Sequence, residues 1–148
     1  MQLEPEPLEP VVDFAMLADA VQAVQGKLFI LGGGWDTLYV GSFPARHPSL
    51  AIALRLKVPW SSASATLRIG VELQDADGAS MLPGGQVVHP VNLSRRGPPM
   101  DRADIGLVRS FTFNNLMFER PGDYSFVISI DDDVLTRLRF MVRSRARS

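Results

Sequence analysis

Asp75 and Asp77, one residue apart and followed by Gly78, match the start of a calcium-binding loop. Calcium takes oxygen ligands from alternating positions of such a loop. The match ends there, because Ala79 stands at the fifth position and Gln86 stands where a bidentate glutamate is needed. The alternative is a hairpin turn, in which aspartate accepts hydrogen bonds from nearby backbone N–H groups.

A denser acidic cluster follows near the C-terminus, at Asp131, Asp132 and Asp133. Aspartate-rich loops at one end of a β-sandwich can share a hard cation. A turn is again the alternative, since aspartate also tolerates the left-handed backbone conformation. Neither cluster offers the histidines that zinc prefers, and the chain has no cysteine. Disulfides, thiol catalysis and cysteine-ligated metals are therefore excluded.

Nucleophilic catalysis and phosphate binding find little support. The two histidines, His47 and His89, each adjoin a proline, and His47, between Arg46 and Pro48, is predicted to be a surface or turn residue. No Gly-x-Ser-x-Gly elbow exists. The glycines 32–34 follow an apolar segment but lack the Lys-Ser/Thr and the helix of a phosphate loop, so we predict a bulge or tight reversal that positions Trp35. We predict a protein that is not an enzyme and needs no cofactor.

Arginines make up the basic end of the chain. Arg137, Arg139 and Arg143 share one face of the last predicted strand, because successive strand residues alternate between faces. They could dock an acidic partner or guard a strand edge against unwanted pairing. No aromatic residue lies between them on that face and the net charge is −1, so nucleic acid is not expected as a partner. Trp35 and Trp60, at strand ends, are further candidates for a protein interface.

In the segments that position these residues, apolar residues recur at every second position, which is typical of half-buried antiparallel strands. Glycine and proline interrupt the pattern at short intervals. Residues 12–24 could also form a helix, but their apolar spacing favours an edge strand that changes face at a bulge, and 101–105 could form one helical turn. The predicted strands lie near 11–20, 27–32, 35–41, 50–58, 65–74, 86–93, 106–116, 123–131 and 134–142.

Glycine, proline and aromatic motifs recur along the chain: Ala18-Asp-Ala-Val21, Gly26-Lys-Leu-Phe-Ile-Leu-Gly32, Gly34-Trp35-Asp36, Phe43-Pro-Ala45, His47-Pro48 and Pro121-Gly122-Asp-Tyr124. These motifs resemble those of an uncharacterised family of small bacterial β-sandwich proteins. The resemblance covers about residues 11–142 and implies a small sandwich without an established activity. The segment 118–130 also resembles the last hairpin of bacterial immunoglobulin-like domains, which are mostly binding or spacer modules.

A length of 148 residues with 46% hydrophobic residues fits one globular domain. We predict an all-β antiparallel β-sandwich, immunoglobulin-like or Greek-key, with about eight or nine strands over 11–142. An acidic, proline-rich tail (1–10) and a basic tail (143–148) flank it. The N-terminal residues lack the basic and apolar regions of a signal peptide, so we expect a cytoplasmic protein.

The residues at the centres of the alternating apolar faces are predicted to share one core. The predicted function is a non-enzymatic protein-binding or assembly module, acting by self-association or on another protein. The alternative is a sandwich that responds to calcium or a small ligand through its aspartate-rich turns. The residues expected to share the core are Leu54, Ile69, Phe126, Ile128 and Phe140.

Overall fold

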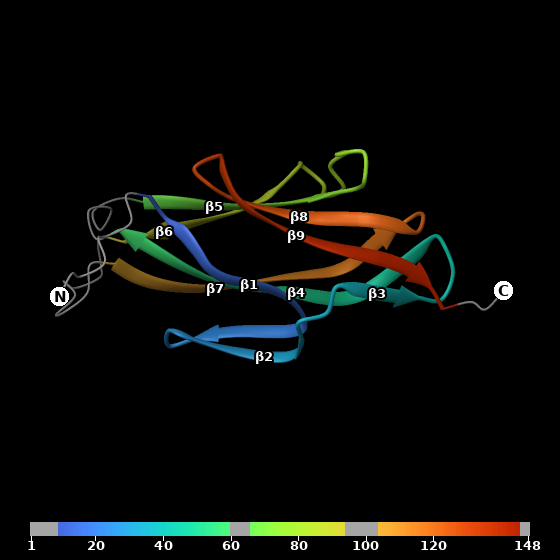
Figure 1. Ribbon diagram of the computed structural model, residues 1–148, viewed down its shortest axis with the longest axis horizontal. Coiled ribbons are helices and arrows are strands. Elements are labelled where there is room, and N and C mark those ends of the chain that lie inside the picture. Colours follow the sequence, from blue (N-terminus) through green and yellow to red (C-terminus); the bar gives the residue numbers. More distant parts are fainter. Residues whose placement is uncertain (1–8, 60–65, 94–103, 146–148) are drawn as a thin grey trace, which may run out of the picture.

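The computed structural model describes residues 9–59, 66–93 and 104–145, which form nine strands and no helix. Long helices of the apolar kind that cross membranes are accordingly absent from these ranges. The strands build two stacked sheets (Figure 1), which confirms the predicted all-β sandwich. Strand was also the correct choice for residues 12–24, where helix was the alternative.

The first sheet has four antiparallel strands in the order β2-β1-β4-β7. β4 pairs with β7 along almost its whole length, from Ala45 opposite Phe118 to Pro59 opposite Asp104. The strands are β1 (Val11–Val24), β2 (Lys27–Gly33), β4 (Ala45–Pro59) and β7 (Asp104–Phe118).

The second sheet has five strands in the order β3-β9-β8-β5-β6. All its pairings are antiparallel except that of β3 with β9, where Thr37 to Val40 run parallel to Met141 to Ser144. The strands are β3 (Thr37–Val40), β5 (Thr66–Gln74), β6 (Val87–Asn92), β8 (Gly122–Ile130) and β9 (Asp133–Ser144).

The main core lies between the two sheets, where alternate residues of both point inward. All five residues predicted to share it do so, and each is at most 5% exposed. Stacked aromatic rings occupy its centre: Phe126 lies 5.0 Å from Phe113 and 5.5 Å from Phe140, measured between ring centroids. Aromatic side chains bury large areas and prefer such offset contacts, so this cluster holds the sheets together.

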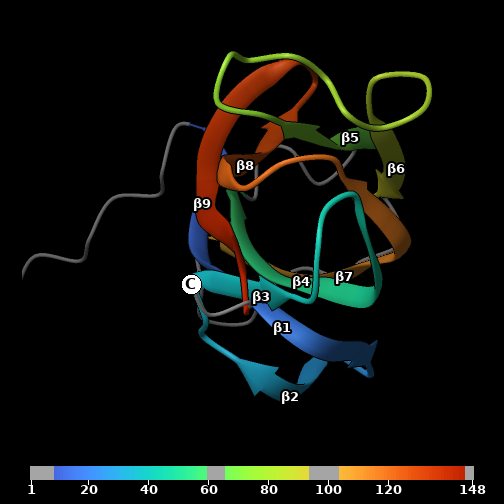
Figure 2. The same ribbon diagram turned by 90° about the vertical axis from the view of Figure 1, so that its right-hand side faces the viewer.

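A β1–β2 ribbon adds a third layer on the outside of the first sheet. β1 pairs with β4 up to Ala18 and with β2 from there onward. The ribbon packs a second, smaller core against the outward face of β4, where Ala51 and Ala53 are fully buried. Alanine has a short side chain, so these positions let the ribbon approach closely. Figure 2 shows β1 and β2 beyond β4, on the side away from β5 and β6.

Several predicted boundaries need correction. β4 begins at Ala45 rather than near residue 50, because the polar stretch from Arg46 to Ser49 continues to pair with β7. β3 is only four residues long, and β1 extends to Val24. β1 was expected at a sheet edge and instead lies between β2 and β4, although the expected irregularity is present after Val12.

The predicted helical turn at 101–105 falls mostly outside the described residues, since 101–103 are not covered. Its last two residues, Asp104 and Ile105, belong to β7. The glycines 32–34 form the predicted reversal, in which the Gly34 N–H donates to the Leu17 carbonyl at 2.8 Å. The chain then reaches Trp35 and crosses to the second sheet.

Candidate functional site

The first aspartate cluster organises a turn. Asp75 follows the last residue of β5, and one of its oxygens, Oδ1, accepts the backbone N–H groups of Asp77 and Ala79, both at 2.9 Å. The second oxygen, Oδ2, lies 3.9 Å from the Arg120 guanidinium, which is also 3.5 Å from Asp77. This is the turn geometry expected of aspartate, whose side chain replaces missing backbone partners.

The second aspartate cluster lies at the β8–β9 turn, beside the opposite end of β5. Asp131 Oδ1 accepts the Arg68 N–H at 3.1 Å, and both Asp131 and Asp132 have positive φ angles, 49° and 72°. Because Arg68 is near the start of β5 and Asp75 follows its end, the two clusters cannot share one cation. Asp133 begins β9 and is exposed.

No preformed metal site accompanies these turns in the part of the chain that the structure describes, where no three acidic, histidine or cysteine side chains gather closely enough to hold an ion. Both histidines lie in strands, which corrects the predicted loop position of His47 and agrees with the predicted strand 86–93 for His89. His89 in β6 stacks on Phe111 with 4.5 Å between ring centroids, and His47 lies in β4. Among the described residues neither imidazole has a hydrogen-bonded carboxylate to orient it.

The arginine row lies on the outward face of β9, as the period of two predicts, and all three side chains are exposed. Arg137 donates to the Gln74 amide oxygen at 3.2 Å, and the Arg143 guanidinium lies 3.6 Å from the Met141 sulfur. β3 pairs with β9 from Met141 to Ser144, so Arg143 lies in the segment that β3 covers, whereas Arg137 and Arg139 precede the pairing with β3. Docking of an acidic partner and guarding of the strand edge therefore both stay predictions for this row.

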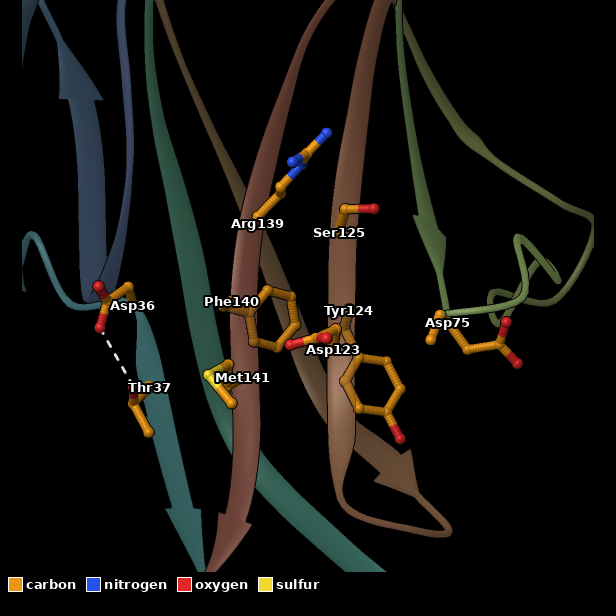
Figure 3. A pocket seen from close by; sticks show the side chains of 10 residues that line it. Asp36, Thr37, Asp75, Asp123, Tyr124, Ser125, Arg139, Phe140 and Met141 are labelled. Carbon is orange, nitrogen blue, oxygen red and sulfur yellow. Dashed lines mark hydrogen bonds between the residues drawn. The ribbon is translucent and has the colours of Figure 1, made fainter.

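A shallow hollow of about 540 Å³ lies beside Arg139 (Figure 3). Its walls carry three carboxylates, those of Asp36, Asp75 and Asp123, against the single guanidinium of Arg139. Figure 3 shows Asp36 and Asp75 on either side of the two central strands, so the negative charge is spread rather than focused. Such a surface suits the cationic side chain of a partner better than a small anion.

Tyr124 stands between this hollow and a second one of about 540 Å³, which is also lined by Met81, Met117 and Arg120. The Tyr124 hydroxyl donates to the Arg120 carbonyl at 2.6 Å and ties the start of β8 to the preceding loop. Burial of the ring raises the pKa of this hydroxyl above its ordinary value of 10.0, against the opposing effect of Arg120.

Of the two tryptophans, Trp35 lies within the described part of the chain. Trp35 is half-buried and packs edge-on against Phe140, with 6.2 Å between ring centroids. Its indole N–H is buried without a hydrogen-bond partner among the described residues. This side chain therefore supports the core, and its role in an interface stays a prediction. Trp60 lies outside the described residues.

The outward face of the β1–β2 ribbon is a surface that sequence reasoning missed. A two-residue turn, Gln25-Gly26, joins the strands, and both residues have positive φ (52° and 73°), as a type I′ hairpin turn requires. Beyond it Phe29 is 56% exposed and Leu31 72% exposed, and Val24 opposite Lys27 is 43% exposed. We call Val24, Phe29 and Leu31 the ribbon patch.

One signal in the sequence could have revealed the ribbon patch. Residues 28–31, Leu-Phe-Ile-Leu, are apolar without alternation, so both faces of β2 are apolar. Runs of this kind belong to strands that are covered on both sides. The structure covers one face only, that of Leu28 and Ile30, which pack into the smaller core.

The patch lies on a sheet edge that carries no visible protection between Leu28 and Leu31. Natural edges are usually short, charged, bulged or interrupted by proline. Edge strand β3 has four residues, β6 contains Pro90, and β7 has polar outward residues and a positive φ at Asn115. β2 has seven residues, with no proline and no charge after Lys27, and its one residue of positive φ, Gly32 at 62°, lies beyond Leu31.

A protein-family model matches residues 13–143, the family of unknown function DUF6941. The chain belongs to this family. This membership confirms the resemblance to an uncharacterised β-sandwich family and brings no activity with it. A search of functionally curated proteins finds no match.

Solved structures show likeness of fold. The Pseudomonas fluorescens alkylpurine DNA glycosylase AlkC, bound to DNA containing an abasic site analogue, is similar with a TM-score of 0.53 and 10% identity. The match covers 91% of this chain and 30% of the glycosylase, so the chain corresponds to less than a third of that protein.

Two further structures are similar at lower TM-scores. The C-terminal domain of wzt gives 0.45 at 13% identity, over 97% of this chain and 77% of that one. An immunoglobulin-like protein from Pseudomonas aeruginosa gives 0.39 at 12% identity, over 91% and 97%.

Proposed function

We propose that this protein is a non-enzymatic protein-binding or assembly module whose contact surface is the ribbon patch and the free edge of β2. The observation that carries the proposal is the exposure of Phe29 and Leu31 on an unprotected edge strand. An edge strand offers backbone N–H and C=O groups to a partner strand, and exposed apolar side chains add area to bury.

The fold supports this proposal because the β1–β2 ribbon is already packed against β4. Ala51 and Ala53 on β4 are fully buried beneath it, so the ribbon is anchored rather than loose. A preorganised strand loses less conformational entropy on binding than a mobile segment does. The ribbon can therefore present Phe29 and Leu31 in a fixed geometry to a partner.

The second candidate function is a response to calcium or to a small ligand. The observation in its favour is the pair of hollows around Tyr124, with carboxylates on their walls. Against it, Asp75 already accepts two backbone N–H groups through one oxygen and lies near Arg120 through the other, which reduces its capacity for a cation.

Site-specific photo-crosslinking in the native host tests the main proposal. A photoreactive residue replaces Phe29 in one strain and Tyr39 in a control strain, since these aromatic side chains are similarly exposed, at 56% and 53%. We expect a discrete crosslinked protein from position 29, lost when Leu31→Lys is added, and none from position 39. Equal crosslinking from both positions, or none from either, would contradict the proposal.

A further inference from the structure

We propose that the partner of the β2 edge is the β2 edge of a second copy of this chain, paired antiparallel around a two-fold axis at Ile30. This inference rests on the proposed function and names its partner. The two copies would join their four-stranded sheets into one continuous sheet. Three properties of β2 support the pairing: its backbone pattern, its side-chain register and its charges.

The backbone pattern follows from the turn. A type I′ turn closes with a hydrogen-bonded pair, here Val24 opposite Lys27, and such pairs alternate along an antiparallel ladder. Lys27, Phe29 and Leu31 therefore direct their backbone groups toward β1. Leu28 and Ile30 direct their backbone N–H and C=O groups toward the free edge, where a second strand can form hydrogen bonds with them.

The side-chain register is self-complementary about Ile30. A two-fold axis there places Ile30 opposite its equivalent and Phe29 opposite Leu31 of the second copy. Both of these side chains point outward and are largely exposed in the single chain. Cross-strand pairs of aromatic and aliphatic side chains stabilise antiparallel sheets. The pairing thus buries the most exposed apolar side chains of the ribbon patch against each other.

The charges at the two ends of β2 are also self-complementary. Lys27 begins the strand, and the Asp19 carboxylate lies against Gly32 near its end, where a Cβ on Gly32 would collide with it. Both side chains are exposed, and neither has an ion-pair partner within the described ranges.

The antiparallel register brings these charges together between copies. It sets Lys27 opposite Gly33 of the second copy, and Asp19 lies on the neighbouring strand β1 near that glycine. Two strand spacings of about 4.8 Å separate the backbones, a gap that the two side chains can bridge. Within one chain the same residues lie at opposite ends of the ribbon, so they can pair only between chains.

The expected dimer is weak and reversible. One strand and a few side chains from each copy form a contact at the low end of known interface sizes, for which micromolar dissociation constants are common. The two-fold symmetry closes the assembly at two copies, because each chain has one β2 edge and uses it fully.

Sedimentation velocity over a concentration series tests the pairing with matched variants. Phe29→Lys with Leu31→Lys places charges on the edge, which should raise the dimer dissociation constant more than tenfold. Tyr39→Lys with Val134→Lys adds the same charge at side chains of 53% and 54% exposure elsewhere and should leave it unchanged. Phe29→Thr with Leu31→Thr keeps strand propensity and should weaken the dimer as well. Circular dichroism confirms that each variant folds.

A charge swap tests the register. Lys27→Asp alone and Asp19→Lys alone should each weaken the homodimer about tenfold, because each creates two like-charge contacts per dimer. A mixture of the two variants should form a heterodimer of parental affinity at low salt. Weakened homodimers without recovery in the mixture would overturn the register.

The parent chain distinguishes this inference from the proposed function. A parent that stays monomeric up to about 1 mM overturns self-pairing, since even weak complexes associate at that concentration. If position 29 then crosslinks to a different protein in cells, the binding module stands and the second copy is the wrong partner. If position 29 crosslinks to nothing, both proposals fail.

Discussion

Two substitutions, Phe126→Ala and Phe29→Ala, distinguish a side chain packed in the core from one exposed at the surface by their effects on the free energy of unfolding. Phe126 is fully buried and stacks between Phe113 and Phe140, at 5.0 and 5.5 Å. Phe126→Ala should lower the free energy of unfolding by about 3–5 kcal/mol, the range for aromatic truncation in a packed core. Phe29 is 56% exposed, so Phe29→Ala should cost about 1 kcal/mol or less.

Urea unfolding followed by circular dichroism measures both variants against the parent. At low protein concentration, where any dimer dissociates, Phe126→Ala should also lower Tm by about 10–20 °C. Equal losses for the two variants would refute the reasoning, because they would show that the ribbon patch is packed in the chain itself. A loss below about 1 kcal/mol for Phe126→Ala would refute the assignment of the core.

Three further variants test other parts of the molecule. Asp75→Ala removes the acceptor of two backbone N–H groups and should lower the free energy of unfolding in urea by about 1–2 kcal/mol. Calcium should not raise the Tm of the parent chain. A calcium-dependent rise in Tm that Asp75→Ala abolishes would favour the ligand-responsive alternative. Because the pKa of Tyr124 is raised in the folded chain, its contribution to stability is complete below pH 10 and falls as the pH rises through and above that value. Tyr124→Phe should therefore reduce the loss of stability at alkaline pH. An unchanged slope of the free energy of unfolding against pH would contradict this prediction. Changing Arg137, Arg139 and Arg143 together to Ser should slow association with an acidic partner and flatten its salt dependence in stopped-flow kinetics, whereas an unchanged on-rate would remove the arginine row from the account.

The strands could be predicted from the sequence because their signal is local. Alternation in segments such as 67–73 and 137–143 reflects one buried and one more exposed face, whereas 124–130 alternates in sequence although β8 is buried on both faces from Phe126 onward. The start of β4 was missed for the same reason. Between Arg46 and Ser49 the residues are polar and include Pro48, so nothing local shows that they continue the pairing with β7.

The candidate site depends on neighbours, which the alternating pattern does not specify. Sequence spacing put the arginines on one face of β9 correctly, but it could not show that β3 covers part of that strand. It suggested β1 as an edge, whereas β2 is the edge and β1 lies inside the sheet. Ala51 and Ala53 look like ordinary outward residues until the ribbon that buries them is seen.

Residue-resolved amide hydrogen exchange in β2 tests the pairing of its free edge most directly. At low protein concentration the amides of Phe29 and Leu31, which face β1, should be protected, while those of Leu28 and Ile30 should exchange rapidly. At high concentration Leu28 and Ile30 should gain protection in parallel with dimer formation, and Phe29→Lys with Leu31→Lys should abolish that gain. Rapid exchange at Leu28 and Ile30 at every concentration, with a dimer present, would contradict the account.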